Sequence, residues 1–371
     1  MLIGVPKEIK NHEYRVGLTP ESVSELTSRG HSAIVESRAG LGIGATDDLY
    51  RAAGAEIVDA ADEVFARAEM IVKVKEPQAV ERAMLREGQI LYTYLHLAPD
   101  PEQTKDLVGS GAVCIAYETV TDEAGGLPLL KPMSQVAGRL SVQAGAAALE
   151  KSHGGRGVLL GGVPGVAPAK VVIIGGGVVG FNAAQMAVGA HADVTILDRS
   201  PAVLERLENH LEASAKVIYS TRSALQYLVS RADLVIGAVL IPGAAAPKLV
   251  TRQMLSTMQD GAVIVDVAID QGGCFETSKA TTHQEPTYVI DGVVHYCVAN
   301  MPGGVARTST YALNNVTLEH AITIADKGWK KALAEDPHLL AGLNVAFGKV
   351  TYEAVANDLG YDYVAAETFV A

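Results

Sequence analysis

The strongest constraint on the fold of this chain is the segment 170–198, KVVIIGGGVVGFNAAQMAVGAHADVTILD. Its β-branched run 171–174 predicts a buried parallel strand, and Gly175, Gly177 and Gly180 follow as G-x-G-x-x-G. In this pattern the first glycine allows a tight turn, the second lets a pyrophosphate approach the backbone, and the third lets a helix pack closely on the strand. The segment therefore predicts a strand–turn–helix unit that binds a dinucleotide.

The residues after the glycines indicate which dinucleotide binds. A helix from about Val178 to Ala190 would direct its free N–H groups and its positive dipole end at the phosphates. The next strand, 192–197, is followed by Asp198, and an acid there accepts both ribose hydroxyls of NAD and repels the 2′-phosphate of NADP. We therefore expect NAD as the cofactor, although the adjacent Arg199 can weaken that selectivity. A glycine-rich turn that binds nothing would leave Asp198 unexplained.

Composition and charge exclude several classes of protein. The chain has 371 residues, of which 49% are hydrophobic and 19% charged, and a mean hydropathy of +0.20, so we expect much burial between domains or subunits. The net charge of −12 argues against nucleic acid or an anionic membrane as a partner. The charged N-terminus is unlike a signal peptide, and no long apolar stretch predicts a membrane span, so we expect a cytoplasmic protein. The scattered Cys114, Cys274 and Cys297 indicate neither a disulfide framework nor a metal site.

Before residue 130 the chain alternates between strand and helix patterns, which predicts a first α/β domain with a parallel sheet. A long helix of small and apolar residues, capped by Pro132-Met133-Ser134 and running over 135–152, is suited to connect two domains. The expected strands are 2–5, 33–36, 70–75, 89–96 and 113–117, and the expected helices are 20–29, 47–53 and 101–108.

After Asp198 the alternation continues, with a final strand expected at 294–298 and a long helical region from Thr308 onwards. The predicted fold is α/β, with two doubly wound parallel-sheet domains joined by long helices, of which the central one is a Rossmann domain. The other strands expected in that domain are 215–219, 234–238 and 262–267, the last of them leading to Asp266 and Asp270.

Ligands of open parallel sheets bind outside the carboxyl ends of the strands. Arg15 and Lys75 could clamp a small carboxylate, Arg by a bidentate pair and Lys as a point charge. His96 is the natural acid–base near neutral pH. The polar residues at the predicted strand ends are Arg15, Lys75 and His96 in the first domain, and Asp198, Asp270 and Asn300 in the second.

Position alone leaves these assignments open. Lys75 after a strand and Arg15 in a polar loop are compatible with simple solvation, and His96 is one of ten histidines. Asp270 could be only a turn residue before Gln-Gly-Gly, and Asp266 could be the functional acid in its place.

At these residues the chain resembles the alanine dehydrogenase family from end to end. The resemblance implies reversible, NAD-dependent oxidative deamination of L-alanine to pyruvate and ammonium by a homohexamer. It also implies a discontinuous substrate domain, 1–130 and 307–371, around an NAD-binding domain, 131–306. Ala306 is a mild departure, since family members tend to have proline there. The matching segments are MLIGVPKEIKNHEYRVGLTP, VKVKEP, LYTYLHLA, KPMSQVAGR, VVIIGGGVVG with Asp198, VDVAIDQGG, and VANMPGG followed by ARTST.

The same resemblance assigns roles to individual residues. It implies that Arg15 and Lys75 hold the substrate carboxylate, that His96 is the acid–base for the water and carbinolamine steps, and that Asp270 assists the proton transfers. The residues expected to line the NAD site are Ser134, Gly175, Gly177, Val178, Val179, Gly180, Asp198, Ser220, Val239, Leu240, Asp270 and Met301.

The nearest alternative is the NAD-binding component of proton-translocating transhydrogenase, a module that the chain also resembles. That component lacks the strand-end histidine and lysine, whereas this chain has His96 and Lys75. A saccharopine dehydrogenase-type enzyme and a non-catalytic NAD sensor are further alternatives.

Overall fold

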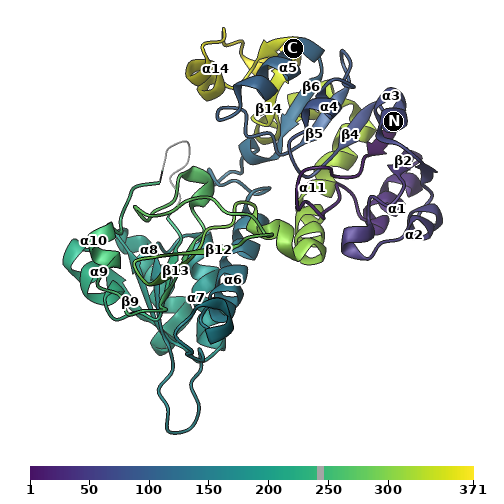
Figure 1. Ribbon diagram of the computed structural model, residues 1–371. Coiled ribbons are helices and arrows are strands. Elements are labelled where there is room, and N and C mark those ends of the chain that lie inside the picture. The colour runs from purple at the N-terminus through teal and green to yellow at the C-terminus, as the bar shows by residue number, and fades with distance from the viewer. Residues whose placement is uncertain (240–245) are drawn as a thin grey trace. The chain divides into compact units, whose positions relative to one another are not determined.

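The computed structural model describes residues 1–239 and 246–371, which form two compact units (Figure 1). The terminal unit comprises Met1–Met133 and Val305–Ala371, and the central unit comprises Ser134–Gly304. Each unit is built on a mainly parallel sheet with flanking helices, which confirms the predicted α/β class.

The sheet of the terminal unit has the strand order β15-β14-β6-β5-β4-β1-β2-β3, and β1 to β6 are all parallel. From β1 the chain first adds β2 and β3 on one side of this strand, and then adds β4, β5 and β6 on its other side. Open α/β sheets bind ligands at such a reversal of strand order. The parallel strands are β1 (Leu2–Val5), β2 (Ser32–Glu36), β3 (Glu56–Val58), β4 (Met70–Val72), β5 (Ile90–Thr93) and β6 (Val113–Ala116).

The first helix of this unit begins as predicted. Thr19 accepts a hydrogen bond from the Ser22 amide at 3.2 Å, and Pro20 occupies the first helical position. The helices are α1 (Pro20–Ser28), α2 (Asp47–Ala52), α3 (Ala61–Arg67), α4 (Ala79–Arg82), α5 (Pro101–Ser110), α11 (Ala306–Lys327), α12 (Trp329–Glu335), α13 (Pro337–Leu340) and α14 (Glu353–Leu359).

Strands β4 and β5 each end three residues earlier than predicted, at Val72 and Thr93. One backbone hydrogen bond continues beyond each end, from the Lys73 amide to the Tyr92 carbonyl at 3.1 Å and from the Tyr94 amide to the Val74 carbonyl at 3.2 Å. The backbone N–H groups that follow are accepted by side-chain carboxylates. The Val74 amide donates to Oε1 of Glu8 at 2.7 Å, and the amides of residues 95 and 96 donate to the Glu118 carboxylate. Lys75 and His96 therefore stand in loops beyond the strand ends.

The prediction that 294–298 is the final strand was wrong. β13 (Val293–Tyr296) is followed by β14 (Leu343–Ala346) and β15 (Lys349–Val350) in the terminal unit. β14 pairs antiparallel with β6, and β15 pairs antiparallel with β14. In the central unit β12 (Thr287–Ile290) is likewise antiparallel to β13, so each sheet carries antiparallel pairing at one edge.

The sheet of the central unit has the order β12-β13-β11-β10-β7-β8-β9, with its reversal at β7 between β8 and β10. Alternating side chains of the parallel strands pack against α7 and α6 on one face, where they bury a continuous apolar core. The remaining elements are β7 (Lys170–Ile174), α7 (Val178–Gly189), β8 (Asp193–Asp198), α8 (Pro201–Leu211), β9 (Lys216–Tyr219), α9 (Arg222–Val229), β10 (Leu234–Gly237), α10 (Arg252–Leu255) and β11 (Val263–Asp266).

Helix α6 (Lys131–Ala148) starts four residues before the predicted start at Gln135 and ends before residue 152. Pro132 and Ser134 thus lie in its first turn and not in a cap. A proline is tolerated there because first-turn N–H groups have no partner within the helix. The helix crosses the boundary between Met133 and Ser134. Within residues 1–239 and 246–371, no helix has the length and apolarity needed to cross a membrane.

Candidate functional site

The glycine turn after β7 has the geometry that its sequence predicts. A Cβ atom on Gly180 would lie 1.8 Å from the Gly175 carbonyl oxygen, and one on Gly175 would lie 2.7 Å from the Ala238 oxygen. Gly175 also has a φ of +101°, which favours glycine. A Cβ on Gly177, by contrast, would have no atom of the described residues within 4 Å. The fold itself therefore requires the first and third glycines, whereas the second borders open space at the start of α7.

The acid at the end of β8 faces this turn. Oδ2 of Asp198 accepts the Gly176 amide at 2.7 Å, and its Oδ1 accepts the Ser200 amide at 2.8 Å. Gly177 is the N-cap of α7, and no side chain caps this helix start in the described chain. Oriented N–H groups and a fixed carboxylate thus lie together at the sheet reversal.

Other residues expected at this site lie around the same strand ends. Ser220 follows β9 and donates its amide to the Asp198 carbonyl at 2.8 Å. Val239 follows β10, and its Cγ2 would lie 3.1 Å from a Cβ on Gly175. Leu240 is outside the described residues. The structure brings Gly175, Asp198, Ser220 and Val239 to one edge of the central sheet.

The remaining expected NAD-site residues differ in exposure. Val178 is half-buried at the start of α7, whereas Val179 is buried in the core of the unit. Ser134 is half-buried in the first turn of α6. Met301 is 3% exposed and packs in the same core as Val179.

The structure distinguishes the two acids that follow β11. Asp270 is exposed on a 3-10 turn, Ile269–Gln271. Asp266 is fully buried and accepts hydrogen bonds from the amides of Cys274 at 2.9 Å and Ala268 at 3.1 Å. Burial raises the pKa of Asp266, while these hydrogen bonds oppose the rise. Asp266 thus holds the loop in place through these hydrogen bonds, whereas Asp270 is the acid of this loop that is exposed.

In the terminal unit the loops after β4 and β5 are joined directly. The Thr93 hydroxyl donates to the Lys75 carbonyl at 3.0 Å, and the Tyr94 amide donates to the Val74 carbonyl at 3.2 Å. These bonds hold the Lys75 loop beside the segment that carries His96.

The side chain of Lys75 is only 15% exposed, and its ammonium group lies 3.7 Å from Oε2 of Glu76. Glu76 is also ion-paired with Lys10. Burial alone would raise the pKa of Glu76, but the charges of Lys75 and Lys10 outweigh it and lower that pKa. Glu76 is therefore a carboxylate counter-ion beside the predicted substrate lysine.

Arg15 is 2% exposed, and Glu13 fixes the plane of its guanidinium group. Nε donates to Oε1 of Glu13 at 2.7 Å, and Nη2 donates to Oε2 at 2.6 Å. Nη1 lies 3.1 Å from the Met133 sulfur. Burial would lower the pKa of Arg15, but the bidentate contact with Glu13 raises it. Arg15 is thus a fixed, permanently charged group.

His96 is exposed although both of its neighbours, Leu95 and Leu97, are buried. Its φ of 51° is in the left-handed region, which non-glycine residues rarely adopt. Its ring centroid lies 5.8 Å from that of the buried Tyr94. The backbone turn therefore directs the imidazole outward from the strand end.

Next to these loops lies a buried charge cluster that the sequence pattern did not predict. Nζ of Lys73 contacts Oε1 of Glu81 at 2.7 Å and Oε2 of Glu8 at 3.0 Å. Oε1 of Glu8 in turn accepts the Val74 amide at 2.7 Å.

Glu118 was not predicted either, although it follows the predicted strand 113–117 directly. Extending the strand-end rule to every polar residue would have found it.

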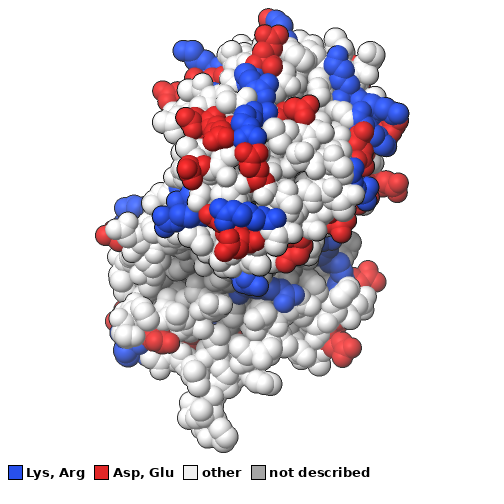
Figure 2. All heavy atoms as spheres, turned by 90° about the vertical axis from the view of Figure 1, so that its right-hand side faces the viewer, with Lys and Arg blue, Asp and Glu red and all other residues white. Residues whose placement is uncertain are grey.

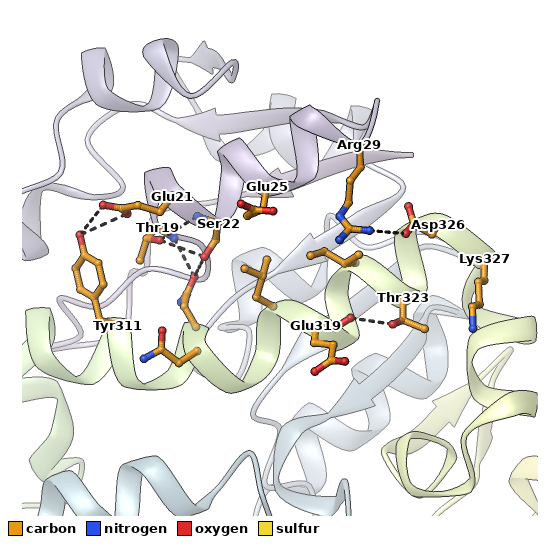
Figure 3. A pocket seen from close by; sticks show the side chains of 14 residues that line it. Thr19, Glu21, Ser22, Glu25, Arg29, Tyr311, Glu319, Thr323, Asp326 and Lys327 are labelled. Carbon is orange, nitrogen blue, oxygen red and sulfur yellow. Dashed lines mark hydrogen bonds and ion pairs between the residues drawn. The ribbon is translucent and has the colours of Figure 1, made fainter.

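A groove of about 740 Å³ runs between α1 and α11 of the terminal unit (Figure 3). The Tyr311 hydroxyl donates to Glu21 at 3.3 Å at one end, and Arg29 pairs with Asp326 at 3.4 Å at the other. None of the predicted substrate residues of this unit lines it. The groove is therefore distinct from the strand-end site. Among the described residues no group of His, Cys, Asp and Glu side chains is arranged to hold a metal ion.

The reversal at β7, the glycine turn and the acid after β8 place the central unit in the class of Rossmann-type dinucleotide-binding folds. Comparison with known proteins then gives the family. The model of the N-terminal domain of alanine dehydrogenase/PNT matches residues 4–137, and that of the C-terminal domain matches 141–353. The chain belongs to the alanine dehydrogenase/PNT family, which confirms the resemblance seen in the sequence.

Individual relatives cover the chain along its full length. An alanine dehydrogenase of Halomonas elongata is 62% identical over 370 residues and covers 100% of both chains. A solved structure of an L-alanine dehydrogenase superposes with a TM-score of 0.95 at 51% identity, covering 97% of this chain and 99% of that one. A transhydrogenase structure from Sinorhizobium meliloti has a TM-score of 0.82 at 26% identity, covering 95% of this chain and 100% of that one.

Proposed function

We propose that this protein is an alanine dehydrogenase that converts L-alanine, water and NAD reversibly to pyruvate, ammonium and NADH. The observation that carries the proposal is the terminal-unit strand-end site, where a fixed Arg15, a half-buried Lys75 and an outward His96 stand at the carboxyl ends of one sheet. Relatives that match the whole chain and bear the name alanine dehydrogenase support it.

Three features of the central unit support NAD as the cofactor. Gly177 leaves space for a pyrophosphate, the uncapped start of α7 supplies N–H donors, and Asp198 is held as an acceptor for ribose hydroxyls. Bound NAD supplies the acceptor for the hydride that leaves the substrate Cα. We assign 131–306 as the NAD-binding domain and 1–130 with 307–371 as the substrate domain.

The substrate carboxylate would be held by Arg15 and Lys75. The bidentate contact with Glu13 prevents rotation of the Arg15 guanidinium, so one substrate orientation is favoured. Lys75 contributes a point charge, and a substrate carboxylate would compete with Glu76 for it. Holding the carboxylate fixes the direction of the Cα–H bond.

Loss of hydride leaves an imine, which must gain water and then release ammonia. His96 is proposed to take a proton from the attacking water and to pass it to the departing nitrogen. An exposed imidazole on a fixed turn suits both transfers, because one ring nitrogen can accept the proton and later donate it. Asp270, exposed on its 3-10 turn in the central unit, is proposed to assist proton transfer.

The transhydrogenase component is the rival. The Sinorhizobium meliloti structure shares the fold at 26% identity, whereas the Halomonas elongata alanine dehydrogenase is 62% identical. A module of that kind would bind NAD without acting on an amino acid.

The test is steady-state kinetics of the full chain, with L-alanine and NAD in one direction, and with ammonium, NADH and a panel of small 2-oxo acids in the other. The proposal predicts alanine-dependent NAD reduction and a preference for pyruvate. NAD binding without any turnover of alanine or pyruvate would favour the transhydrogenase-type module or a sensor.

We further propose a cytoplasmic homohexamer. The segment 157–169 of the central unit exposes Leu159, Val163 and Val166 at 67%, 54% and 63%, and it contains no charged residue. Figure 2 shows the contrast with the terminal unit, whose visible surface carries many charges of both signs. Exposed apolar side chains of this kind are suited to subunit contacts. Light scattering during size-exclusion chromatography tests the assembly, and a monomeric mass would refute it.

A further inference from the structure

The conformation of His96 requires something to hold it. A φ of 51° costs free energy in a residue with a β-carbon, and such conformations persist only where their surroundings fix them. His96 is also exposed, so burial of its own side chain cannot supply the restraint. The restraint must come from the backbone groups around it.

Glu118 supplies this restraint. Its Oε1 accepts the His96 amide at 2.5 Å and the Leu95 amide at 3.1 Å, and its Oε2 lies 3.2 Å from the Leu95 amide. One carboxylate thus receives the two consecutive N–H groups that precede and begin the left-handed turn. Hydrogen bonds to a charged acceptor are the stronger class of such bonds.

The topology of the sheet explains why the Glu118 carboxylate can reach the amides of residues 95 and 96. β5 and β6 are parallel neighbours in which Thr93 pairs with Ala116, so their carboxyl ends lie side by side. Glu118 stands two residues after Ala116, on the 3-10 turn Tyr117–Thr119. That turn is anchored by Asn344, whose Nδ2 donates to the Thr119 hydroxyl at 2.7 Å.

The carbonyl groups of the same loop have other partners. Nε2 of Gln103 donates to the Leu95 carbonyl at 2.5 Å, and the Thr104 hydroxyl donates to the Leu97 carbonyl at 3.0 Å. Helix α5 therefore secures the carbonyl side of the loop, whereas Glu118 secures its amide side. Only the amide side includes the N–H of His96 itself.

We propose that Glu118 is a positioning residue for catalysis, acting through the backbone of His96 to keep the imidazole in its outward orientation. This inference rests on the proposed role of His96 in proton transfer. Glu118 would touch neither substrate nor cofactor in this role, so its loss should lower kcat and leave the binding steps nearly unchanged.

The terminal unit contains a matched control. Arg38 also has a left-handed backbone, with a φ of 66°, and Oδ1 of Asp47 accepts its amide at 2.7 Å. This is the same carboxylate-to-backbone arrangement without a predicted catalytic residue. Glu118→Ala and Asp47→Ala therefore each remove a carboxylate that accepts the amide of a left-handed residue, one at His96 and one at Arg38.

The first measurement is hydrogen exchange of the full-length variants, which does not depend on enzyme activity. Glu118→Ala should speed exchange of the amides of residues 95 and 96 at least about tenfold, since removing an acceptor from a protected amide opens it to water. Asp47→Ala should instead affect residue 38. Unchanged exchange at 95 and 96 in Glu118→Ala would overturn the proposal whether or not the protein proves to be an alanine dehydrogenase.

The second measurement is kinetic. Glu118→Ala should lower kcat for pyruvate amination by about 10- to 100-fold, less than the about 10²–10⁴-fold that acid–base catalysis contributes, because the imidazole is displaced and not removed, while the pyruvate KM and NADH binding change little. Formate, which fits the space left by the carboxylate, should partly restore this activity. Asp47→Ala should keep near-normal kcat.

A double-mutant cycle shows whether the effect passes through His96. In a His96→Ala background, Glu118→Ala should cause no further loss of kcat, because the group that it positions is gone. An additional loss of the same size in both backgrounds would show that Glu118 acts independently and would refute the positioning role. Absence of alanine turnover in the unaltered protein would instead refute the proposed function, and hydrogen exchange would still decide whether Glu118 holds the turn.

Discussion

The ammonium of Lys73 and the carboxylate of Glu81 form an ion pair at 2.7 Å in which the side chains are only 0% and 1% exposed. A second buried carboxylate, that of Glu8, lies 3.0 Å from the same ammonium and also accepts the Val74 amide. Burial raises the pKa of Glu8, and the charge of Lys73 opposes this rise. One lysine thus balances two buried acids directly before the loop that carries Lys75.

The first prediction concerns this cluster. Lys73→Met should lower the free energy of unfolding by about 3–5 kcal/mol, because it leaves buried carboxylates without their counter-ion. Urea unfolding measures the loss. The control is Lys327→Met, which removes a pair with Glu335 whose side chains are 43% and 47% exposed and should cost at most about 1 kcal/mol. Equal losses in the two variants would show that burial does not strengthen the role of Lys73.

The second prediction separates the glycines of the turn after β7. Gly180→Ala should destabilise the protein by about 3 kcal/mol, because the new methyl group meets the Gly175 carbonyl at 1.8 Å. Gly177→Ala should leave the melting temperature nearly unchanged, since its φ of −66° suits any residue and its Cβ would meet no atom of residues 1–239 and 246–371. It should weaken NAD binding about tenfold or more, which titration of NADH fluorescence measures. Unimpaired binding would remove Gly177 from the pyrophosphate site.

The strand–turn–helix geometry at the glycine turn after β7 shows what the sequence could predict. The positions of Gly175, Gly180 and Asp198 depend on local geometry, because a strand, a tight turn, a helix and a second strand that follow one another allow few other residue types at these points. Pro20 and Thr19 predicted the start of α1 for the same local reason.

What the sequence could not predict depends on contacts between distant segments. Nothing local to β5 indicates that backbone pairing stops soon after Thr93; the amides of residues 95 and 96 are instead taken by Glu118, more than twenty residues away. The strand at 343–346 was missed because its partner, β6, lies over two hundred residues earlier in the chain. The choice between Asp266 and Asp270 likewise needed burial, which pattern alone does not give.

The third prediction concerns cofactor choice. Asp198→Asn should lower the ratio of kcat/KM for NAD to that for NADP about tenfold or more, because a hydrogen bond to a charged group contributes about 1.5–3 kcal/mol. The neutral amide would also lack the charge with which the Asp198 carboxylate repels a 2′-phosphate. Arg199→Ala should raise the same ratio, since it removes a cation beside the acid. A ratio that is unchanged in Asp198→Asn would exclude this carboxylate as the selector.

The fourth prediction concerns the groups that act on the substrate. His96→Ala should lower kcat by about 10²–10⁴-fold while NADH still binds, because general acid–base catalysis contributes that much. Lys75→Ala should instead raise the KM for both alanine and pyruvate as well as abolish most turnover. Near-normal kcat in His96→Ala would remove it from the mechanism, and a normal KM in Lys75→Ala would refute its contact with the carboxylate.

The fifth prediction concerns pH and the central unit. His295 is fully buried, its Nδ1 donates to the Val293 carbonyl at 2.8 Å, and its Nε2 lies 2.7 Å from the Thr277 hydroxyl. Burial lowers the pKa of His295 from its usual 6.5, so the unfolded chain binds a proton that the folded chain resists.

The stability that results is fully present above pH 6.5 and is lost as the pH falls through the lowered pKa of the folded state. Urea unfolding of the central unit between pH 7.5 and 5 should therefore show a decrease in the free energy of unfolding. His295→Asn should be less stable at neutral pH but should show a shallower decrease, because its amide does not titrate. Parallel pH profiles for the two proteins would mean that other groups cause the acid sensitivity.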